Sequence, residues 1–166
     1  MPPSEVERNV QLSFLDRLIN DRPDLKSDPF LSRSESLRRF RRAIKRDLEF
    51  LLNSVRNSAP IPDSYNEVKN SLYLYGLPDL NSVTLDSPQD ETRLLRSLEE
   101  AISNFEPRLS RVRVTSYERL SKKKSALFFH VEALLMIDPA PEPISFDTVL
   151  EIAKGTYSVK EGQSSA

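Results

Sequence analysis

Two pairs of ionisable residues are spaced so that chemistry is conceivable. Glu106 and Arg108 flank Pro107, and His130 and Glu132 stand two positions apart in an apolar run. In extended chain such residues project from the same side, so each pair would be presented together. A histidine beside a carboxylate can act as a general acid or base, and a glutamic acid can protonate a glycosidic oxygen. General acid–base catalysis and glycoside hydrolysis are therefore the chemistries to consider.

The rest of the composition argues against both. The chain has one histidine, no cysteine, no tryptophan and three glycines. These counts argue against a metal site built from histidine or cysteine, a catalytic triad and a glycine-rich phosphate loop. They also provide no tryptophan on which a sugar could stack. Arg108 would also lower the pKa of Glu106, whereas a general acid needs a raised pKa. We expect no catalytic residue, no cofactor, no metal and no small-molecule substrate.

Pro107 marks a change in the spacing of apolar residues, from helical before it to alternating after it. Because proline disfavours the helical conformation in the residue before it, a helix should end near Phe105 and the chain should continue extended. At this corner Arg108 can bond helix-end carbonyls and Glu106 can bond the turn. The residues favour this local role, and presentation of the pair to a partner is the alternative.

Helical spacing dominates the first two thirds of the chain. We predict a short amphipathic helix over residues 10–19, followed by an extended arm over 21–31. A capping box from Ser32 to Glu35 opens the strongest helix, which should fade near Asn57. A second box opens a helix over residues 64–75, with Gly76 as its left-handed terminus. Ser87 and Pro88 begin a third long helix, which runs to the corner.

Strand spacing dominates the last third. Val112 and Val114 alternate with arginines, residues 126–137 indicate a central strand covered on much of both faces, and residues 138–143 form a stiff connector. Residues 144–152 and 157–159 give two further strands. His130 and Glu132 would match Arg111 or Arg113 across the sheet.

These elements predict an α+β fold, with N-terminal helices packed on a small, mainly antiparallel C-terminal sheet of three to four strands. The expected organisation is an N-terminal helix and arm over residues 1–32, a single domain over 33–159 and a flexible tail over 160–166.

The charges are balanced overall and uneven locally. The chain has 24 basic and 25 acidic residues, whereas residues 33–46 contain seven basic residues and one acidic residue. Because the net charge is near zero and no aromatic residues interleave, we interpret this face, with Arg38, Arg39 and Arg42, as a solvated or partner-facing surface. A nucleic-acid-binding module is the alternative. The N-terminus shows no secretory signal and no stretch is long enough to span a bilayer, so we expect a soluble cytoplasmic protein.

Several stretches, in order and spacing over about residues 12–159, closely resemble the TssE family of baseplate subunits of the bacterial type VI secretion system. They are Arg46–Asn53, Asn70-Ser71, Tyr75–Asp79, Phe105–Leu109, Glu132–Leu135 and Pro139–Thr148. The related family includes the tailed-phage baseplate wedge protein, which has an old "lysozyme-like" label. The resemblance implies a structural role. A lysozyme-like peptidoglycan hydrolase is the enzymatic alternative.

The resemblance also implies partners and a location. TssE-like proteins sit in the wedge with TssF, TssG and TssK and template the first ring of the contractile sheath, so we expect a cytoplasmic protein at an inner-membrane-docked baseplate. The family's signature maps onto Glu106, Pro107 and Arg108, which the resemblance places where wedge subunits meet. We expect an edge formed by about residues 146–159, including Phe146, Thr148 and Leu150, to pair with the sheath. No nucleic acid and no direct membrane insertion are expected.

Overall fold

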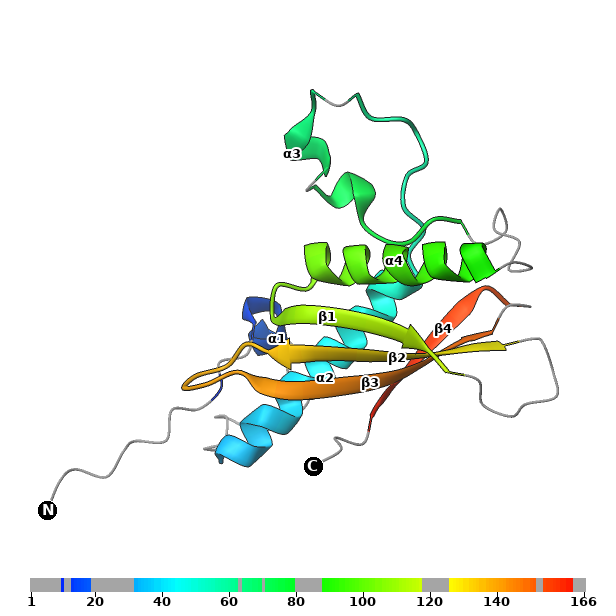
Figure 1. Cartoon of the computed structure of the whole chain (residues 1–166). Helices are drawn as coiled ribbons and strands as arrows, with labels where there is room; N and C mark the ends of the chain where they lie inside the picture. The colour runs from blue at the N-terminus through cyan, green and yellow to red at the C-terminus, as the bar shows by residue number, and fades with distance from the viewer. Residues whose placement is uncertain are drawn as a thin grey trace, which may run out of the picture.

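The computed structural model describes residues 10, 13–18, 32–62, 64–69, 71–79, 88–117, 126–151 and 154–162. Its helical elements are α1 (Phe14–Leu18), α2 (Arg33–Leu52), α3 (Asn66–Lys69), the 3-10 turn η1 (Leu72–Leu74) and α4 (Pro88–Phe105). Its strands are β1 (Leu109–Ser116), β2 (Ala126–Leu135), β3 (Glu142–Glu151) and β4 (Thr156–Glu161). The strands form one antiparallel sheet in the order β1-β2-β3-β4 (Figure 1).

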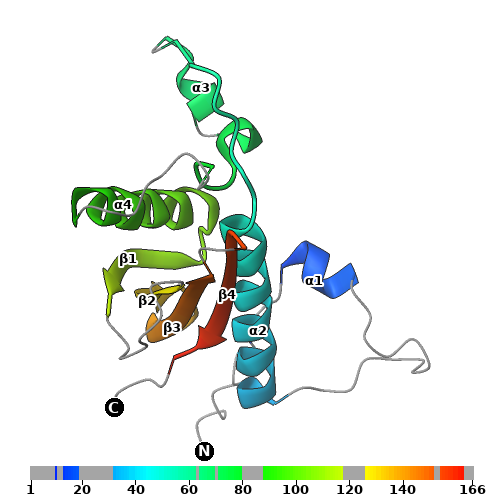
Figure 2. The same ribbon diagram turned by 90° about the vertical axis from the view of Figure 1, so that its right-hand side faces the viewer.

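The two long helices pack on one face of this sheet, which confirms the predicted α+β fold. Figure 2 shows α4 over β1 and α2 beside β4, and the two helices also contact each other. Their apolar stripes and the alternate residues of all four strands form a single core, in which Ile44, Ile102, Phe129 and Phe146 are fully buried. None of the helices in the described ranges is long and apolar enough to cross a membrane.

The predicted start of α2 is confirmed, but the helix ends earlier than predicted. Ser32 and Glu35 form the predicted capping box. The helix ends at Leu52, before the expected Asn57, because Asn53 caps it and turns its side chain to the backbone of β4. Val55, which lies within the helix predicted to reach about Asn57, is 69% exposed and forms an isolated bridge with Leu77.

The helix predicted over residues 64–75 is wrong as a continuous element. The chain forms only the short α3 and then η1, because the Ser71 hydroxyl donates to the carbonyl of Val68 (2.8 Å) and accepts from the amide of Tyr73 (3.2 Å). Such local bonds compete with the helical ladder. Gly76 has the predicted positive φ, 106°, but it follows η1 rather than an α-helix.

The first strand contains a β-bulge that the alternation did not predict. Leu109 and Val114 are both buried although an odd number of positions separates them. The pairing with β2 shifts between Ser110 and Arg113, and Arg111 has a φ of 51°. The extra residue of the bulge shifts the alternation of side chains by one position, so Leu109 and Val114 both point into the core.

The central strand is internal as predicted, but only one of its faces is buried, whereas cover over much of both faces was expected. Phe129, Val131, Ala133 and Leu135 are buried, whereas the intervening residues are half-buried or, at Glu132, exposed. The reason is that α2 and α4 both lie on the same face.

Several boundaries differ from expectation. Glu142 and Pro143, expected in the connector, begin β3, and Lys160 and Glu161, expected in the tail, belong to β4. Helix α1 is shorter than the predicted helix over residues 10–19, of which residues 11, 12 and 19 lie outside the described residues. The predicted arm over 21–31, the cap at Ser87 and Ile152 of the third strand also lie outside them.

Candidate functional site: an ionic cluster at the helix-to-strand corner

The corner after α4 is closed by backbone bonds on both sides of Pro107. The amide of Glu106 donates to the carbonyl of Ile102 (2.9 Å), which extends the helical ladder by one residue. The carbonyl of Glu106 accepts from the amide of Leu109 (3.0 Å), which starts β1. Glu106 is only 3% exposed, so its carboxylate needs partners within the protein.

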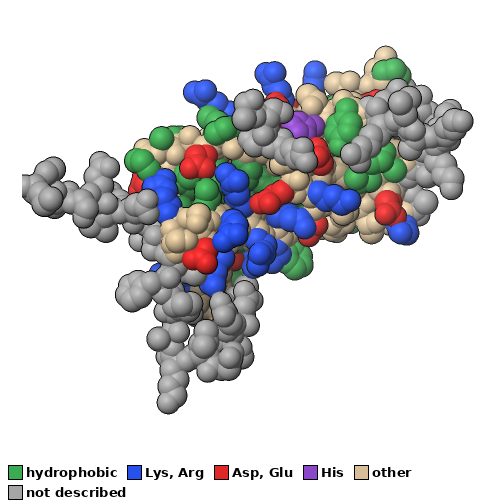
Figure 3. Space-filling view, turned by 90° about the horizontal axis from the view of Figure 1, so that it is seen from below, with side chains coloured by type: hydrophobic (Ala, Val, Ile, Leu, Met, Phe, Trp, Pro, Cys, Tyr) green, Lys and Arg blue, Asp and Glu red, His purple; other side chains and the backbone are tan. Residues whose placement is uncertain are grey.

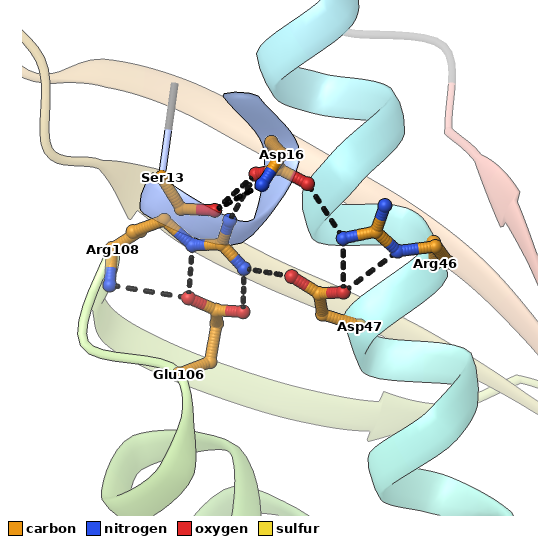
Figure 4. Close-up of polar contacts among 6 residues, drawn as sticks. All are labelled: Ser13, Asp16, Arg46, Asp47, Glu106 and Arg108. Atoms are coloured by element: carbon orange, nitrogen blue, oxygen red, sulfur yellow. Dashed lines mark hydrogen bonds and ion pairs between the residues drawn. The ribbon is translucent and has the colours of Figure 1, made fainter. Parts of the chain in front are cut away.

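Arg108 supplies those partners from the same chain. Its Nε donates to Glu106 Oε1 (2.6 Å) and its Nη2 to Glu106 Oε2 (2.5 Å), a two-pronged pair (Figure 4). The backbone amide of Arg108 also donates to Glu106 Oε1 (3.3 Å). Paired N–H groups on one carboxylate form the strongest type of charged hydrogen bond and fix the relative orientation of the two side chains.

Two further elements extend this pair into a cluster. Arg108 Nη2 donates to Asp47 Oδ2 on α2 (2.6 Å), and Arg46 binds Asp47 Oδ1 through Nε (2.9 Å) and Nη2 (2.7 Å). Arg46 Nη2 also donates to Asp16 Oδ1 on α1 (2.6 Å). We call these five residues the ionic cluster: Asp16, Arg46, Asp47, Glu106 and Arg108 (Figure 4).

The electrostatics of the cluster follow from these bonds. Burial alone would lower the pKa of Arg108, but the hydrogen bonds and charges of Glu106 and Asp47 raise it, so the guanidinium stays charged. Burial raises the pKa of Asp16, but the bonds from Ser13 and Arg46 outweigh it and the net shift is downward. Arg108 also lies 5.7 Å over the Phe40 ring. A glutamate held by a charged arginine is suited to structure and not to proton transfer.

The sequence indicated Glu106 and Arg108 but not the other members of the cluster. Asp47 interrupts the exposed basic face of α2, and Asp16 lies in a different helix, 30 residues before Arg46. Only the quoted resemblance, which includes Arg46 and Asp47, pointed to α2. The contact of Glu106 with Arg108 is intramolecular in the isolated chain.

The second pair singled out by the sequence lies on the outer face of the sheet. His130 Nδ1 is 2.9 Å from Asp147 Oδ1 on β3, and His130 Nε2 is 3.7 Å from Glu132 Oε1. Arg113 stands opposite Glu132 in the register of β1 and β2, as expected, but the ion pairs of His130 are with acids. Within the described ranges no group of histidine and acidic residues is arranged to hold a metal ion.

The basic face of α2 is largely neutralised within the chain. Arg33 donates to the carbonyl of Asp138, Arg41 pairs with Glu142, Lys45 lies 3.8 Å from Glu49, and Arg46 belongs to the ionic cluster. Among the described residues, the remaining three form no salt bridge, although the charge of Glu35 acts on the first two: they are Arg38, Arg39 and Arg42. Figure 3 shows the result from below: basic side chains lie interspersed with acidic ones.

Phe146, Thr148 and Leu150 lie in the core. Each is at most 1% exposed, and β4 covers the edge of β3. Residues 146–159, which were expected to form a sheet edge, include parts of β3 and β4. Of these two strands, β4 lies at an edge of the sheet and β3 is internal.

The outward backbone groups of β4 are bonded to α2. Asn53 exchanges two 2.9 Å bonds with the amide and carbonyl of Tyr157, and Glu49 Oε1 accepts from the amide of Val159 (3.1 Å). At the opposite edge Glu99 of α4 accepts from the amide of Val114 (2.8 Å).

The chain matches the model of a known protein family. The family model described as baseplate wedge protein gp25 matches residues 38–140. This range runs from α2 to the turn before β3 and contains every member of the ionic cluster except Asp16. A comparison with curated proteins found no match.

Proposed function

The chain belongs to the baseplate wedge protein gp25 family, and we propose that it serves in the baseplate wedge of a bacterial type VI secretion system. Membership in this family makes it a non-enzymatic structural component of contractile injection machinery, not a peptidoglycan hydrolase. The observation that carries the proposal is the family match over α2, the corner and β2, together with the TssE-like stretches in the same range.

We propose that the wedge partners are TssF, TssG and TssK, at the cytoplasmic side of the inner membrane. The side chains of Arg38, Arg39 and Arg42, which form no salt bridge among the described residues, supply a surface that an acidic patch on such a partner would complement. Nucleic acid is the weaker fit, because four of the seven basic residues of this face already bond groups within the chain. The ionic cluster would hold the partner-facing elements α1, α2 and the corner in register.

We further propose that the chain templates the first sheath ring through the edge of its sheet. An incoming strand at β4 would replace the side-chain bonds of Asn53 and Glu49 with main-chain bonds to Tyr157 and Val159. Phe146, Thr148 and Leu150 would support this edge from the core, since β3 forms the ladder on which β4 lies.

The experiment uses source cells that carry a fluorescent sheath subunit. The double variant Arg38→Glu/Arg42→Glu should fold normally, because both side chains are exposed, and should reduce the number of sheaths at least tenfold. The matched control is Arg56→Glu/Arg96→Glu, which reverses two exposed arginines elsewhere and should leave sheath number unchanged. Sheath assembly at the wild-type level in the first variant, with its melting curve unchanged, would refute this docking surface.

A further inference from the structure

Helix α1 is held to the body of the protein by very little apolar contact. Its residues Phe14, Leu15 and Leu18 are 76%, 60% and 65% exposed, and none of its residues is buried. Val10, just before it, is only partly buried against the core. Figure 2 shows α1 on the side of α2 that faces away from the sheet. Burial of apolar surface therefore contributes little to its attachment.

Within the described residues, the carboxylate of Asp16 provides the polar attachment of α1 to the rest of the protein. The Asp16 side chain is 5% exposed although its helix is exposed. Its Oδ1 accepts from Arg46 Nη2 (2.6 Å), and its Oδ2 lies 2.5 Å from Ser13 Oγ and 3.7 Å from Arg108 Nη1. Figure 4 shows Asp16 reaching from α1 to the two guanidinium groups.

Arg108 retains capacity for a carboxylate after its other bonds are counted. Arg108 uses Nε and Nη2 for Glu106 and Asp47, and its buried Nη1 has no hydrogen-bond partner among the described residues. An unbonded buried donor costs free energy, so this nitrogen favours an acceptor placed closer than Asp16 Oδ2. The site is therefore incompletely filled by α1.

Further basic side chains lie along α2 next to this site. Arg39 and Arg42 precede Arg46 by seven and four positions, which places them along the same side of the helix. Neither forms a salt bridge within the described ranges. A ligand with several carboxylates would thus find Arg46 and Arg108 at one end of a basic row and Arg39 at the other.

We propose that Arg46 and Arg108 form a carboxylate-binding site that the chain's own Asp16 occupies in the free subunit, and that an acidic amphipathic helix of a wedge partner takes this site when α1 leaves. This inference rests on the proposed function for the identity of the partner. The exposed apolar side chains of α1 explain why the internal ligand is replaceable: within the described residues, its attachment depends on the ionic contacts of Asp16 with Arg46 and Arg108. A partner helix that added apolar burial and a closer acceptor for Arg108 would bind more strongly.

The first measurement asks whether Asp16 holds α1. In the full chain, Asp16→Asn should increase the hydrogen-exchange rate of the amides of residues 14–18 at least tenfold, because the ionic contact is lost. Arg17→Gln is the matched control: it removes a charge from the adjacent, exposed position of α1 and should leave those rates unchanged. Unchanged rates in Asp16→Asn would overturn the inference.

The second measurement asks whether the site recognises a carboxylate in trans. The probe is a fluorescent peptide with the sequence of residues 10–19. It should bind the full-length Asp16→Asn chain at least tenfold more tightly than the wild-type chain, whose site is occupied. The same peptide with Asp16→Asn should bind neither, and the additional change Arg46→Gln in the chain should abolish binding.

Equal binding to both chains, or binding that does not depend on the peptide carboxylate, would overturn the inference. These readouts use the purified chain alone and do not depend on sheath assembly. If the peptide binds as expected while the Arg38→Glu/Arg42→Glu cells assemble sheaths normally, the proposed docking surface fails and the carboxylate site stands. If the peptide does not bind while those cells lose their sheaths, the reverse holds.

Discussion

Removal of the Arg108 guanidinium is the perturbation whose effect the structure predicts most sharply. Arg108→Met keeps an unbranched apolar stem but removes every side-chain bond to Glu106 and Asp47, together with the guanidinium contact on the Phe40 ring. The Glu106 side chain is 5% exposed, so its charge would remain in a poorly solvated site. Breaking a buried ion pair in this way typically costs about 3–5 kcal/mol, and we expect the lower half of that range because Arg108 itself is partly solvated.

That loss would be a large share of the stability of a single domain, which is about 5–15 kcal/mol. At about 2–4 °C per kcal/mol for a chain of this size, the melting temperature should fall by roughly 6–16 °C. The assay is urea unfolding at pH 7 followed by circular dichroism, with thermal unfolding as a second measurement.

A double-mutant cycle isolates the pair from the general effect of substitution. Glu106→Gln combined with Arg108→Met removes both charges, so the double variant should be more stable than the sum of the single losses predicts, by at least about 1.5 kcal/mol. Additive losses, or a loss below about 1 kcal/mol for Arg108→Met alone, would show that the corner is not held by this ion pair.

Four further predictions concern other parts of the molecule. Gly76→Ala should lower the free energy of unfolding by at least about 1–2 kcal/mol in urea titration, because φ is 106° and the added Cβ would collide with the Ser54 carbonyl. Thr148→Val should keep or raise stability, by up to about 1 kcal/mol, because the buried Thr148 hydroxyl has no partner among the described residues. Ser32→Ala should cost about 1 kcal/mol through loss of the α2 capping box, measured by the same titration. The bond of α1 to Arg46 should persist down to about pH 4 and be lost as the pH falls through the lowered pKa of Asp16, seen as faster hydrogen exchange in residues 14–18.

Each of these has a clear contrary result. A stable Gly76→Ala chain would mean that the turn relaxes at no cost, and a Thr148→Val chain that loses more than about 1 kcal/mol would mean that the hydroxyl is bonded. A Ser32→Ala chain with unchanged stability would show that the box contributes nothing. Release of α1 already at pH 6 would show that Asp16 does not hold it, since a carboxylate with a lowered pKa is still ionised there.

The elements that the sequence predicted best are those with long apolar periodicity and explicit boundary residues. Helix α2 has a complete capping box, α4 has Pro88 at its start and Pro107 after its end, and β3 alternates throughout its described length. In each case the local signal and the tertiary packing agree, and this agreement makes a sequence-based prediction succeed.

The errors arose where a local interaction or a tertiary contact overrode the pattern. Ser71 breaks the helix predicted over residues 64–75 through its own hydroxyl. The bulge at Arg111 changes which side chains of β1 face the core, and the spacing of apolar residues does not show which residue is inserted. The placement of both long helices on one face, which leaves the other face of β2 open, is a property of the topology and is not encoded in any one segment.

The site was predictable only in part for the same reason. Glu106 and Arg108 are near neighbours in sequence and could be recognised as a pair. Asp16 and Asp47 reach the same point from two helices, and the contact between Arg108 and Asp47 spans 61 positions. Contacts of that sequence separation depend on the packing of α1 and α2 against the corner, which composition and periodicity do not specify.

Cross-linking in source cells tests the baseplate assignment most directly. A photo-reactive amino acid would replace Arg42 on α2 or Leu18 on α1, both exposed, and the captured proteins would be identified by mass spectrometry. We expect the captured proteins to be baseplate wedge or sheath subunits of a type VI secretion system. A folded, abundant chain that cross-links at both positions only to proteins outside a contractile machine would contradict this assignment.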